Sequence, residues 1–329
     1  MDEFRLIAEL WAPLSRDFPG AMALTDDVAL VAGEPATDLA LTTDTIVAGV
    51  HFFPDTAPDL IARKLIRVTL SDLAAKGAAP FAVLLAASFP RDTDHRWLTR
   101  FAAGLGEDLS RFGCALIGGD TVATSGPLTL SLTAMGRVPK GAAILRSGAK
   151  AGDTVWVSGT IGDGALGLAV AEGKFPALTP DARAYLLDRY HLPQPRIATG
   201  QALRGVAHAG MDISDGLIQD LGHLCAASGV SARISAPLVP VSKAARAVLV
   251  ENDALLATML TGGDDYELLF TAPHASGPAL QVLAADLDVP LTAIGTVGVG
   301  EGVTVVDDKG QVMAVPRTGW RHFVSTASG

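Results

Sequence analysis

The chain has 329 residues, of which 49% are hydrophobic and 18% are charged, and its formal net charge at pH 7 is −10. This length suits two domains of about 150 residues each, and the composition is that of a folded protein. The acidic balance argues against a nucleic-acid partner, because such surfaces need clustered Lys and Arg. The longest apolar run, residues 81–89, is too short to span a membrane, and the acidic amino terminus does not resemble a signal peptide. We therefore expect a cytoplasmic protein without a nucleic-acid or membrane partner.

The first candidate site residues are two acids, Asp26 and Asp27, at the start of a predicted strand over residues 23–31. An Asp-Asp pair in this place also fits a solvated turn, so both interpretations stay open.

Residues 41–53 are predicted to form a buried strand with a carboxylate, Asp44, near its middle. Side chains alternate along a strand, so Thr42 and Asp44 should share one face and Thr43 should lie on the other. Because an unpaired buried carboxylate is costly, we expect a cation opposite Asp44, and our hypothesis is a metal ion.

A helix is predicted from Pro58 to Gly77. At 100° per residue, Ile61, Leu65 and Val68 fall within one narrow sector, and Asp72 shares it. Asp72 should thus lie on the apolar face of its helix; a frayed last turn with the acid in solvent is the alternative.

Residues 81–88 are predicted as a strand, residues 94–112 as a helix, and residues 114–121 as a strand that runs into a glycine turn. Two glycines let the backbone approach a ligand closely, and Asp120 follows Gly119 directly, at the strand end where α/β sheets bind ligands. A tight turn with a solvent-exposed Asp fits equally well.

Turn residues 151–153 mark the predicted boundary between domains 1–150 and 151–329. Residues 162–167 match the GxGxxG pattern of dinucleotide-binding folds. No second strand is predicted after this motif, so the βαβ unit is missing, and a loop shaped for close packing is the better interpretation.

The second domain repeats the combination of acids with small residues. Asp212 and Ser214 should share one face at a strand end, and Ser214 or Asp215 fits the alternative role of capping the helix that runs to Ala227. A second Gly-Gly-Asp sequence occurs at residues 262–264.

Taken together, the acids favour magnesium and phosphoryl transfer. Several carboxylates cannot share a dry site without counter-cations, because each raises the pKa of the next. Oxygen ligands, with only two cysteines in no ligand pattern, favour Mg²⁺ over Zn²⁺, and several Mg²⁺ ions indicate a polyphosphate substrate. The acids in this set are Asp27, Asp44, Asp72, Asp120, Asp212 and Asp215.

Seven motifs, in order along the chain, resemble the thiamine-monophosphate kinase family. They span residues 26–30, 42–52, 70–77, 117–121, 146–150, 212–217 and 262–268. The resemblance implies the two-domain α/β (α+β) fold of the aminoimidazole ribonucleotide synthetase-like superfamily, with mixed sheets flanked by helices. It also implies a homodimer that binds ATP with several Mg²⁺ ions.

The resemblance further implies a role for each matching residue. The implied Mg²⁺ ligands are Asp27, Thr42, Thr43, Asp44, Asp72, Asp120, Asp212 and Asp215, among which Asp72, Asp120 and Asp212 are the implied catalytic acids. The implied ATP-binding residues are Gly119, Asp120, Arg146 and Ser214. The implied thiamine monophosphate contacts are His51, Asp264, Trp320 and Phe323.

The implied reaction is direct in-line transfer of the γ-phosphoryl group of ATP to thiamine monophosphate, the last step of thiamine diphosphate biosynthesis. Two residues depart from the family pattern: Thr25 replaces a usual Gly, and Asp264 replaces a usual Glu. Three alternatives stay open, namely a superfamily enzyme with another acceptor, a dehydrogenase based on residues 162–167, and a nucleotide-binding regulator without catalysis.

Overall fold

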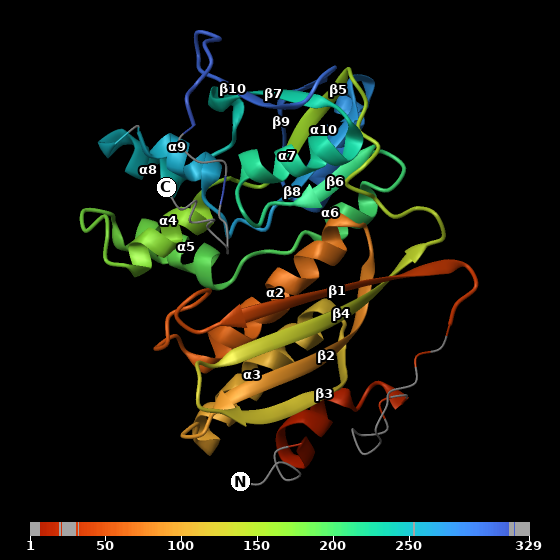
Figure 1. Ribbon diagram of the computed structural model, residues 1–329, viewed down its shortest axis with the longest axis vertical. Helices are drawn as coiled ribbons and strands as arrows, with labels where there is room; N and C mark the ends of the chain where they lie inside the picture. Colours follow the sequence, from red (N-terminus) through yellow and green to blue (C-terminus); the bar gives the residue numbers. More distant parts are fainter. Residues whose placement is uncertain are drawn as a thin grey trace, which may run out of the picture. The chain divides into compact units, whose positions relative to one another are not determined.

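The computed structural model describes residues 7–19, 21, 31, 33–252, 254–315 and 319. The chain forms two compact units, Met1–Ala143 and Ile144–Gly329 (Figure 1). Within the described part of the chain, no helix has the length and apolar character needed to cross a membrane.

The first unit is built on a four-stranded mixed sheet. Its strand order is β1 (Thr37–Val47), β4 (Thr129–Pro139), β2 (Ala79–Pro90) and β3 (Ala115–Thr124). Strand β4 is antiparallel to β1 and β2, whereas β2 and β3 are parallel. Two 18-residue helices, α2 (Pro58–Ala75) and α3 (His95–Phe112), lie side by side on one face (Figure 1), and the short helices η1 (Ile7–Trp11) and η2 (Ala12–Ser15) precede the sheet.

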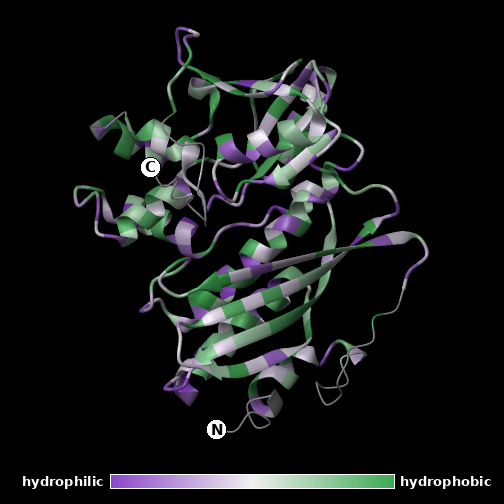
Figure 2. Cartoon of the chain, in the orientation of Figure 1, coloured by the Kyte–Doolittle hydropathy of each residue, from purple (hydrophilic) through white to green (hydrophobic). Residues whose placement is uncertain are grey.

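The periodicity that predicts α2 is confirmed. The helix begins with Pro58 in its first turn, and Ile61, Leu65 and Val68 are all buried beneath it. Along β4, hydrophobic and polar residues alternate over residues 129–134 (Figure 2), and along β1 the burial of the side chains alternates over residues 40–45, so one face of the sheet packs against the helices.

A buried ion pair fixes α2 against α3. The Arg67 guanidinium donates to Asp108 through Nε at 2.5 Å and Nη2 at 3.1 Å, and both side chains are almost fully buried. Arg63 Nε also donates to Asp108, at 3.3 Å. Because α2 carries Asp72 in its last turn, this pair helps to place that acid.

Strand β3 differs from the prediction. The predicted glycine turn after Ile117 is wrong, because β3 continues to Thr124 with a bulge beside Val83 and Leu84 of β2. Gly119 has a φ of +149°, and a Cβ added there would lie 1.8 Å from the Leu85 carbonyl oxygen. A Gly-Gly pair suits a bulge as well as a turn, so the sequence alone did not distinguish them.

The second unit is built on a six-stranded sheet. Its order is β10 (Gly302–Val306), β7 (Ser231–Ser235), β9 (Leu291–Gly298), β5 (Asp153–Ser158), β8 (Leu268–Pro273) and β6 (Ala209–Asp212), and only β10 and β7 are parallel. Its helices are α4 (Asp163–Ala171), α5 (Pro180–His191), α6 (Ile197–Ala202), α7 (Leu217–Ser228), η4 (Ala236–Leu238), α8 (Lys243–Glu251), α9 (Leu255–Thr261), η5 (His274–Ser276) and α10 (Gly277–Leu287). The core lies between the central strands and α7.

The GxGxxG motif does not belong to a dinucleotide-binding βαβ unit. Strand β5, which precedes it, is antiparallel to both of its neighbours, β8 and β9. The glycines instead permit close packing: a Cβ on Gly164 would lie 2.3 Å from the Asp264 carbonyl oxygen, and one on Gly167 would lie 2.2 Å from that of Leu186. The interpretation of this loop as a packing motif is confirmed.

Replacement Asp108→Asn should lower the free energy of unfolding by about 3–5 kcal/mol, because Arg67 is left buried without its counter-charge. Urea denaturation measures this. As a control, Glu172→Gln breaks an exposed ion pair with Lys174 (N–O distance 2.7 Å) and should cost less than about 1 kcal/mol. Equal losses in the two variants would contradict the structural role of Asp108.

Replacement Gly119→Ala should destabilise the protein by more than about 2 kcal/mol, because the methyl group collides with the backbone of β2. The matched control is Gly113→Ala, which has a φ of +67° but nothing within 4 Å of the added Cβ. Its cost should be only about 1 kcal/mol, from backbone strain. Similar thermal unfolding of the two variants would be inconsistent with the close approach of β3 to β2 at Gly119.

Candidate active site

An acidic pair lies on the helix-covered face of the first unit. Thr42 and Asp44 are partly buried on β1 and alternate with the exposed Thr43, which confirms the predicted facing. Asp72 is half-buried in the last turn of α2, and the Thr42 hydroxyl donates to its Oδ2 at 2.5 Å. The sheet contact of α2 therefore brings the predicted acids of two separate motifs together.

The surroundings of Asp44 oppose its negative charge. Burial, and then the nearby Asp72 carboxylate, raise the pKa of Asp44 to about 6, while a hydrogen bond from the Thr69 side chain acts in the opposite direction. A bound cation would relieve the same repulsion. Two carboxylates beside a hydroxyl are hard oxygen ligands, so the residues present fit Mg²⁺.

Thr43 and Asp120 lie on the opposite face of this sheet. Asp120 pairs with Ala86, which pairs with Ser131, which in turn pairs with Thr45. Directly paired residues project from the same face, and Thr45 is on the face of Thr43 rather than of Asp44. The unit therefore does not bring Thr43 or Asp120 to the acidic pair. Gly119 aligns with Asp44 through Leu85 and Leu132, but two strands, β2 and β4, separate it from β1. Within the described residues no cluster of three or more potential metal ligands forms.

His51 lies in a turn after β1. The predicted strand over residues 41–53 is wrong beyond Val47, because the chain turns there at Gly49, whose φ is +79°. The Val47 N–H donates to His51 Nδ1 at 3.1 Å. In the neutral imidazole the proton is then on Nε2, which suits donation to a phosphate oxygen.

In the second unit, α7 organises the loop after β6. Asp212 is buried at the end of β6, and a single oxygen of Asp220, Oδ2, accepts the N–H groups of Ser214 (3.0 Å), Asp215 (3.0 Å) and Gly216 (3.2 Å). The capping alternative for Ser214 and Asp215 is wrong, because Gly216 occupies the N-cap position without a side-chain bond.

Sequence reasoning missed Asp220. Burial is the main reason why its pKa rises to about 7, and the Asp215 charge adds to this, while the three backbone N–H groups lower it. An acid four residues after a Ser-Asp-Gly turn was the available signal. Its role depends on the loop folding back toward α7, which no local pattern shows.

The segment that contains Asp264 pairs with this loop. The Asp264 N–H donates to the Ser214 carbonyl at 2.9 Å, the Tyr266 N–H donates to that of Ile213 at 2.8 Å, and the Ile213 N–H donates to that of Glu267 at 2.9 Å. The structure therefore places the predicted substrate contact Asp264 beside the predicted ATP-binding Ser214.

Two further acids of this segment, Asp265 and Glu267, bind it to neighbouring parts of the second unit. Asp265 accepts the N–H groups of Gly162 (2.8 Å) and Gly164 (3.1 Å), and burial raises its pKa well above the usual range. Glu267 accepts from Arg196 Nε at 2.7 Å and from the Ser158 hydroxyl at 2.5 Å. The glycine-rich loop thus binds a carboxylate of the chain itself, a role that the sequence did not reveal.

Arg146 is exposed on a segment that runs along β6. The Gly210 N–H of that strand donates to the Leu145 carbonyl at 2.8 Å, and the Ser228 hydroxyl donates to the Arg146 carbonyl at 3.1 Å. These bonds place Arg146 beside the strand that ends at Asp212.

Three predicted site residues, Asp27, Trp320 and Phe323, lie outside the described residues. Gly319 is described and packs close to Asp215: a Cβ added to it would lie 2.7 Å from the Asp215 carbonyl oxygen.

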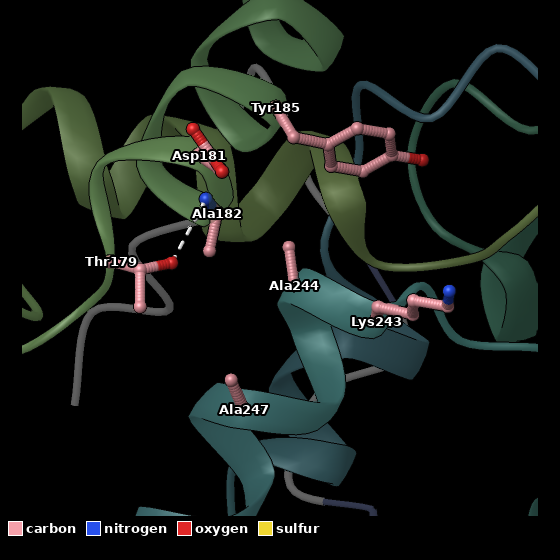
Figure 3. Close-up of a pocket in the computed structure, with 7 residues that line it drawn as sticks. All are labelled: Thr179, Asp181, Ala182, Tyr185, Lys243, Ala244 and Ala247. Carbon is pink, nitrogen blue, oxygen red and sulfur yellow. Dashed lines mark hydrogen bonds between the residues drawn. The ribbon is translucent and has the colours of Figure 1, made fainter.

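A pocket of about 350 Å³ lies between α5 and α8 in the second unit (Figure 3). The residues that line it are Thr179, Asp181, Ala182, Tyr185, Lys243, Ala244 and Ala247. Its described lining includes none of the predicted site residues, so the pocket is separate from the loops around Ser214.

Comparison with known proteins identifies the family. A model of the AIR synthase related protein, N-terminal domain, matches residues 25–138, and one of the C-terminal domain matches residues 150–308. The thiamine-monophosphate kinase of Caulobacter vibrioides is 43% identical over 323 residues, which are 97% of this chain and 90% of the relative.

Solved structures agree in fold and sequence. The crystal structure of thiamine-monophosphate kinase from Stenotrophomonas maltophilia K279a has a TM-score of 0.80 and 43% identity, covering 86% of this chain and 89% of that one. The structure of AaThiL complexed with AMPPCP and TMP has a TM-score of 0.79 and 30% identity, covering 94% and 96%. The predicted α/β fold and the sequence resemblance are thereby confirmed, and the chain belongs to the thiamine-monophosphate kinase family of AIR synthase related proteins.

Proposed function

We propose that the chain transfers the γ-phosphoryl group of ATP to the phosphate of thiamine monophosphate, producing thiamine diphosphate and ADP. The observation that supports this most is the similarity to AaThiL, a relative complexed with AMPPCP and TMP. The acceptor phosphate is already anionic, so the site must mainly screen charge repulsion and align the attack in line. No covalent intermediate with the enzyme is needed.

The proposed Mg²⁺ ligands of the first unit are Asp44, Asp72 and Thr42. A bound cation would offset the repulsion between the two carboxylates, and the Thr42 hydroxyl lies beside Asp72. Bound Mg²⁺ would neutralise phosphate charge and orient the transferred group. Asp27, Thr43, Asp120, Asp212 and Asp215 remain proposed ligands on the strength of the family resemblance.

The proposed nucleotide contacts are Gly119, Asp120, Arg146 and Ser214. The Arg146 guanidinium is exposed and planar, so it suits bidentate pairing with a phosphate. The proposed acceptor contacts are His51, Asp264, Trp320 and Phe323, with Nε2–H of His51 directed to the acceptor phosphate. An aromatic side chain would suit the cationic thiazolium ring.

A homodimer is also part of the proposal. The face of the first sheet that the helices leave uncovered carries Thr43 and Asp120 together with large exposed apolar side chains, Leu41 (60% exposed) and Val122 (48%). Apolar residues gathered on an open sheet face are typical of an interface. A second copy on this face would cover them and would bury Thr43 and Asp120 at a shared surface. The cytoplasmic location stays a prediction.

The reaction is tested directly by incubating the purified protein with ATP, MgCl₂ and thiamine monophosphate, and quantifying products by chromatography. Equimolar thiamine diphosphate and ADP should form, and neither should form with chelator or with thiamine as acceptor. ADP formed without thiamine diphosphate would contradict thiamine monophosphate as the acceptor and would favour another reaction of the superfamily.

Replacement Asp72→Asn should lower kcat by about 100-fold or more, because one anionic Mg²⁺ ligand is lost where charge develops. Circular dichroism should show an unchanged fold. The control is Asp94→Asn, since Asp94 caps α3 by accepting the Trp97 N–H at 2.7 Å and Asn caps equally well. Near-normal turnover of Asp72→Asn at limiting Mg²⁺ would contradict the proposed role of Asp72 as a Mg²⁺ ligand.

Replacement Leu41→Glu should dissociate the dimer by placing a charge on the apolar face of β1. Sedimentation velocity measures the change from two chains to one. The matched control Val250→Glu alters a side chain on α8 that is 88% exposed and should leave the dimer intact. A monomeric wild-type protein, or a dimeric Leu41→Glu variant, would argue against this interface.

A further inference from the structure

The segment over residues 264–267 separates two kinds of side chain. Asp265 and Glu267 are 8% and 5% exposed and are held by backbone N–H groups of the α4 loop and by Arg196. Asp264 and Tyr266, which alternate with them, are only half-buried. The buried members thus fix the segment to the unit, and the other two, which we call the outer residues, remain partly accessible.

The backbone of the two outer residues is unusual. Asp264 has a φ of +71° and Tyr266 has a φ of +51°, in the left-handed region that residues other than glycine rarely adopt. Hydrogen bonds to Ser214 and Ile213 hold both residues in this conformation. Such conformations persist where the surroundings determine them and are typical of functional sites.

A hydrogen bond connects the two outer side chains. The Tyr266 hydroxyl donates to Asp264 Oδ1 at 3.3 Å. A carboxylate offers about four lone-pair sites, so one that accepts from Tyr266 can also accept from a substrate amino group. The tyrosine therefore restricts the directions from which Asp264 can receive a second donor.

We propose that Tyr266 is a positioning residue for the acceptor substrate, acting through Asp264. The tyrosine holds the Asp264 carboxylate in the orientation that pairs with the amino group and positive charge of the thiamine moiety. This inference rests on the proposed function. It assigns a role to a side chain that touches Asp264 rather than the phosphates, so Tyr266 should affect the acceptor and not ATP.

The test is Tyr266→Phe, which removes one hydroxyl and keeps the ring. We expect the KM for thiamine monophosphate to rise about tenfold, as for a lost hydrogen bond to a charged group. The KM for ATP and kcat should stay within about twofold. Calorimetric titration with thiamine monophosphate should show the same loss of affinity.

The matched control is Tyr185→Phe, which removes a hydroxyl that donates to the buried Asp163 Oδ2 at 3.2 Å. A tyrosine with a structural role changes stability only, so this variant should keep both KM values. In an Asp264→Asn background, adding Tyr266→Phe should have no further effect, because the residue through which it acts has lost its charge.

An unchanged KM for thiamine monophosphate in Tyr266→Phe, equal rises in both KM values, or full additivity with Asp264→Asn would each overturn the inference. The wild-type protein separates this outcome from failure of the proposed function. If the wild-type protein phosphorylates thiamine monophosphate and the variants match it, only the role of Tyr266 is contradicted. If the wild-type protein does not phosphorylate it, the proposed function is contradicted as well.

Discussion

The cost of burying a carboxylate governs how acids are used in this protein. Asp108 is paired with Arg67, Glu267 is paired with Arg196, and Asp265 accepts two backbone N–H groups. Each of these acids has hydrogen-bond partners within the fold. Asp44 and Asp72 differ, because the contacts recorded for them within the described part of the chain are with hydroxyl groups and with each other. That difference is why we propose a cation site at Asp44 and Asp72 and not at the paired acids.

The acids with partners in the fold help to place the candidate site residues. The Arg67–Asp108 pair fixes α2, the helix that carries Asp72, against α3. In the second unit, Asp220 shapes the loop that carries Ser214 and Asp215 by accepting three successive N–H groups. Buried polar groups of this kind are costly unless fully paired, and once paired they leave the backbone little freedom. A phosphoryl-transfer site benefits from this rigidity, because its catalysis depends mainly on alignment.

The sequence predicted what depends on local periodicity. The apolar face of α2 and the alternation of Thr42, Thr43 and Asp44 follow from 3.6- and 2-residue repeats, and both are confirmed. The continuation of β3 past Gly119 was not predicted, because only the pairing of β3 with β2 distinguishes it from a turn. The motifs that carry the family resemblance also brought Ser214 and Asp264 forward as candidates, and pairing of their loops places them side by side.

The anchoring acids were missed for a different reason. Asp265 binds the N–H groups of Gly162 and Gly164, and Glu267 binds Arg196, so each partner lies far away in the sequence. The GxGxxG motif was correctly set aside as a dinucleotide site, but its actual ligand, a carboxylate of the same unit, is visible only in the fold. The same limit applied to Asp120, which could be placed on the sheet face opposite Asp44 only from the strand register.

The central claim is that Asp44 and Asp72 form a cation site rather than a structural pair. Thermal unfolding of wild type and Asp44→Asn, in EDTA and in MgCl₂ with AMPPCP, tests it most directly. With EDTA, the variant should melt at or above the wild-type temperature, because one of two repelling carboxylates is gone. With MgCl₂ and AMPPCP, wild type should be stabilised and the variant should lose most of that gain. A variant that is less stable in EDTA yet gains as much as wild type from MgCl₂ and AMPPCP would contradict the account.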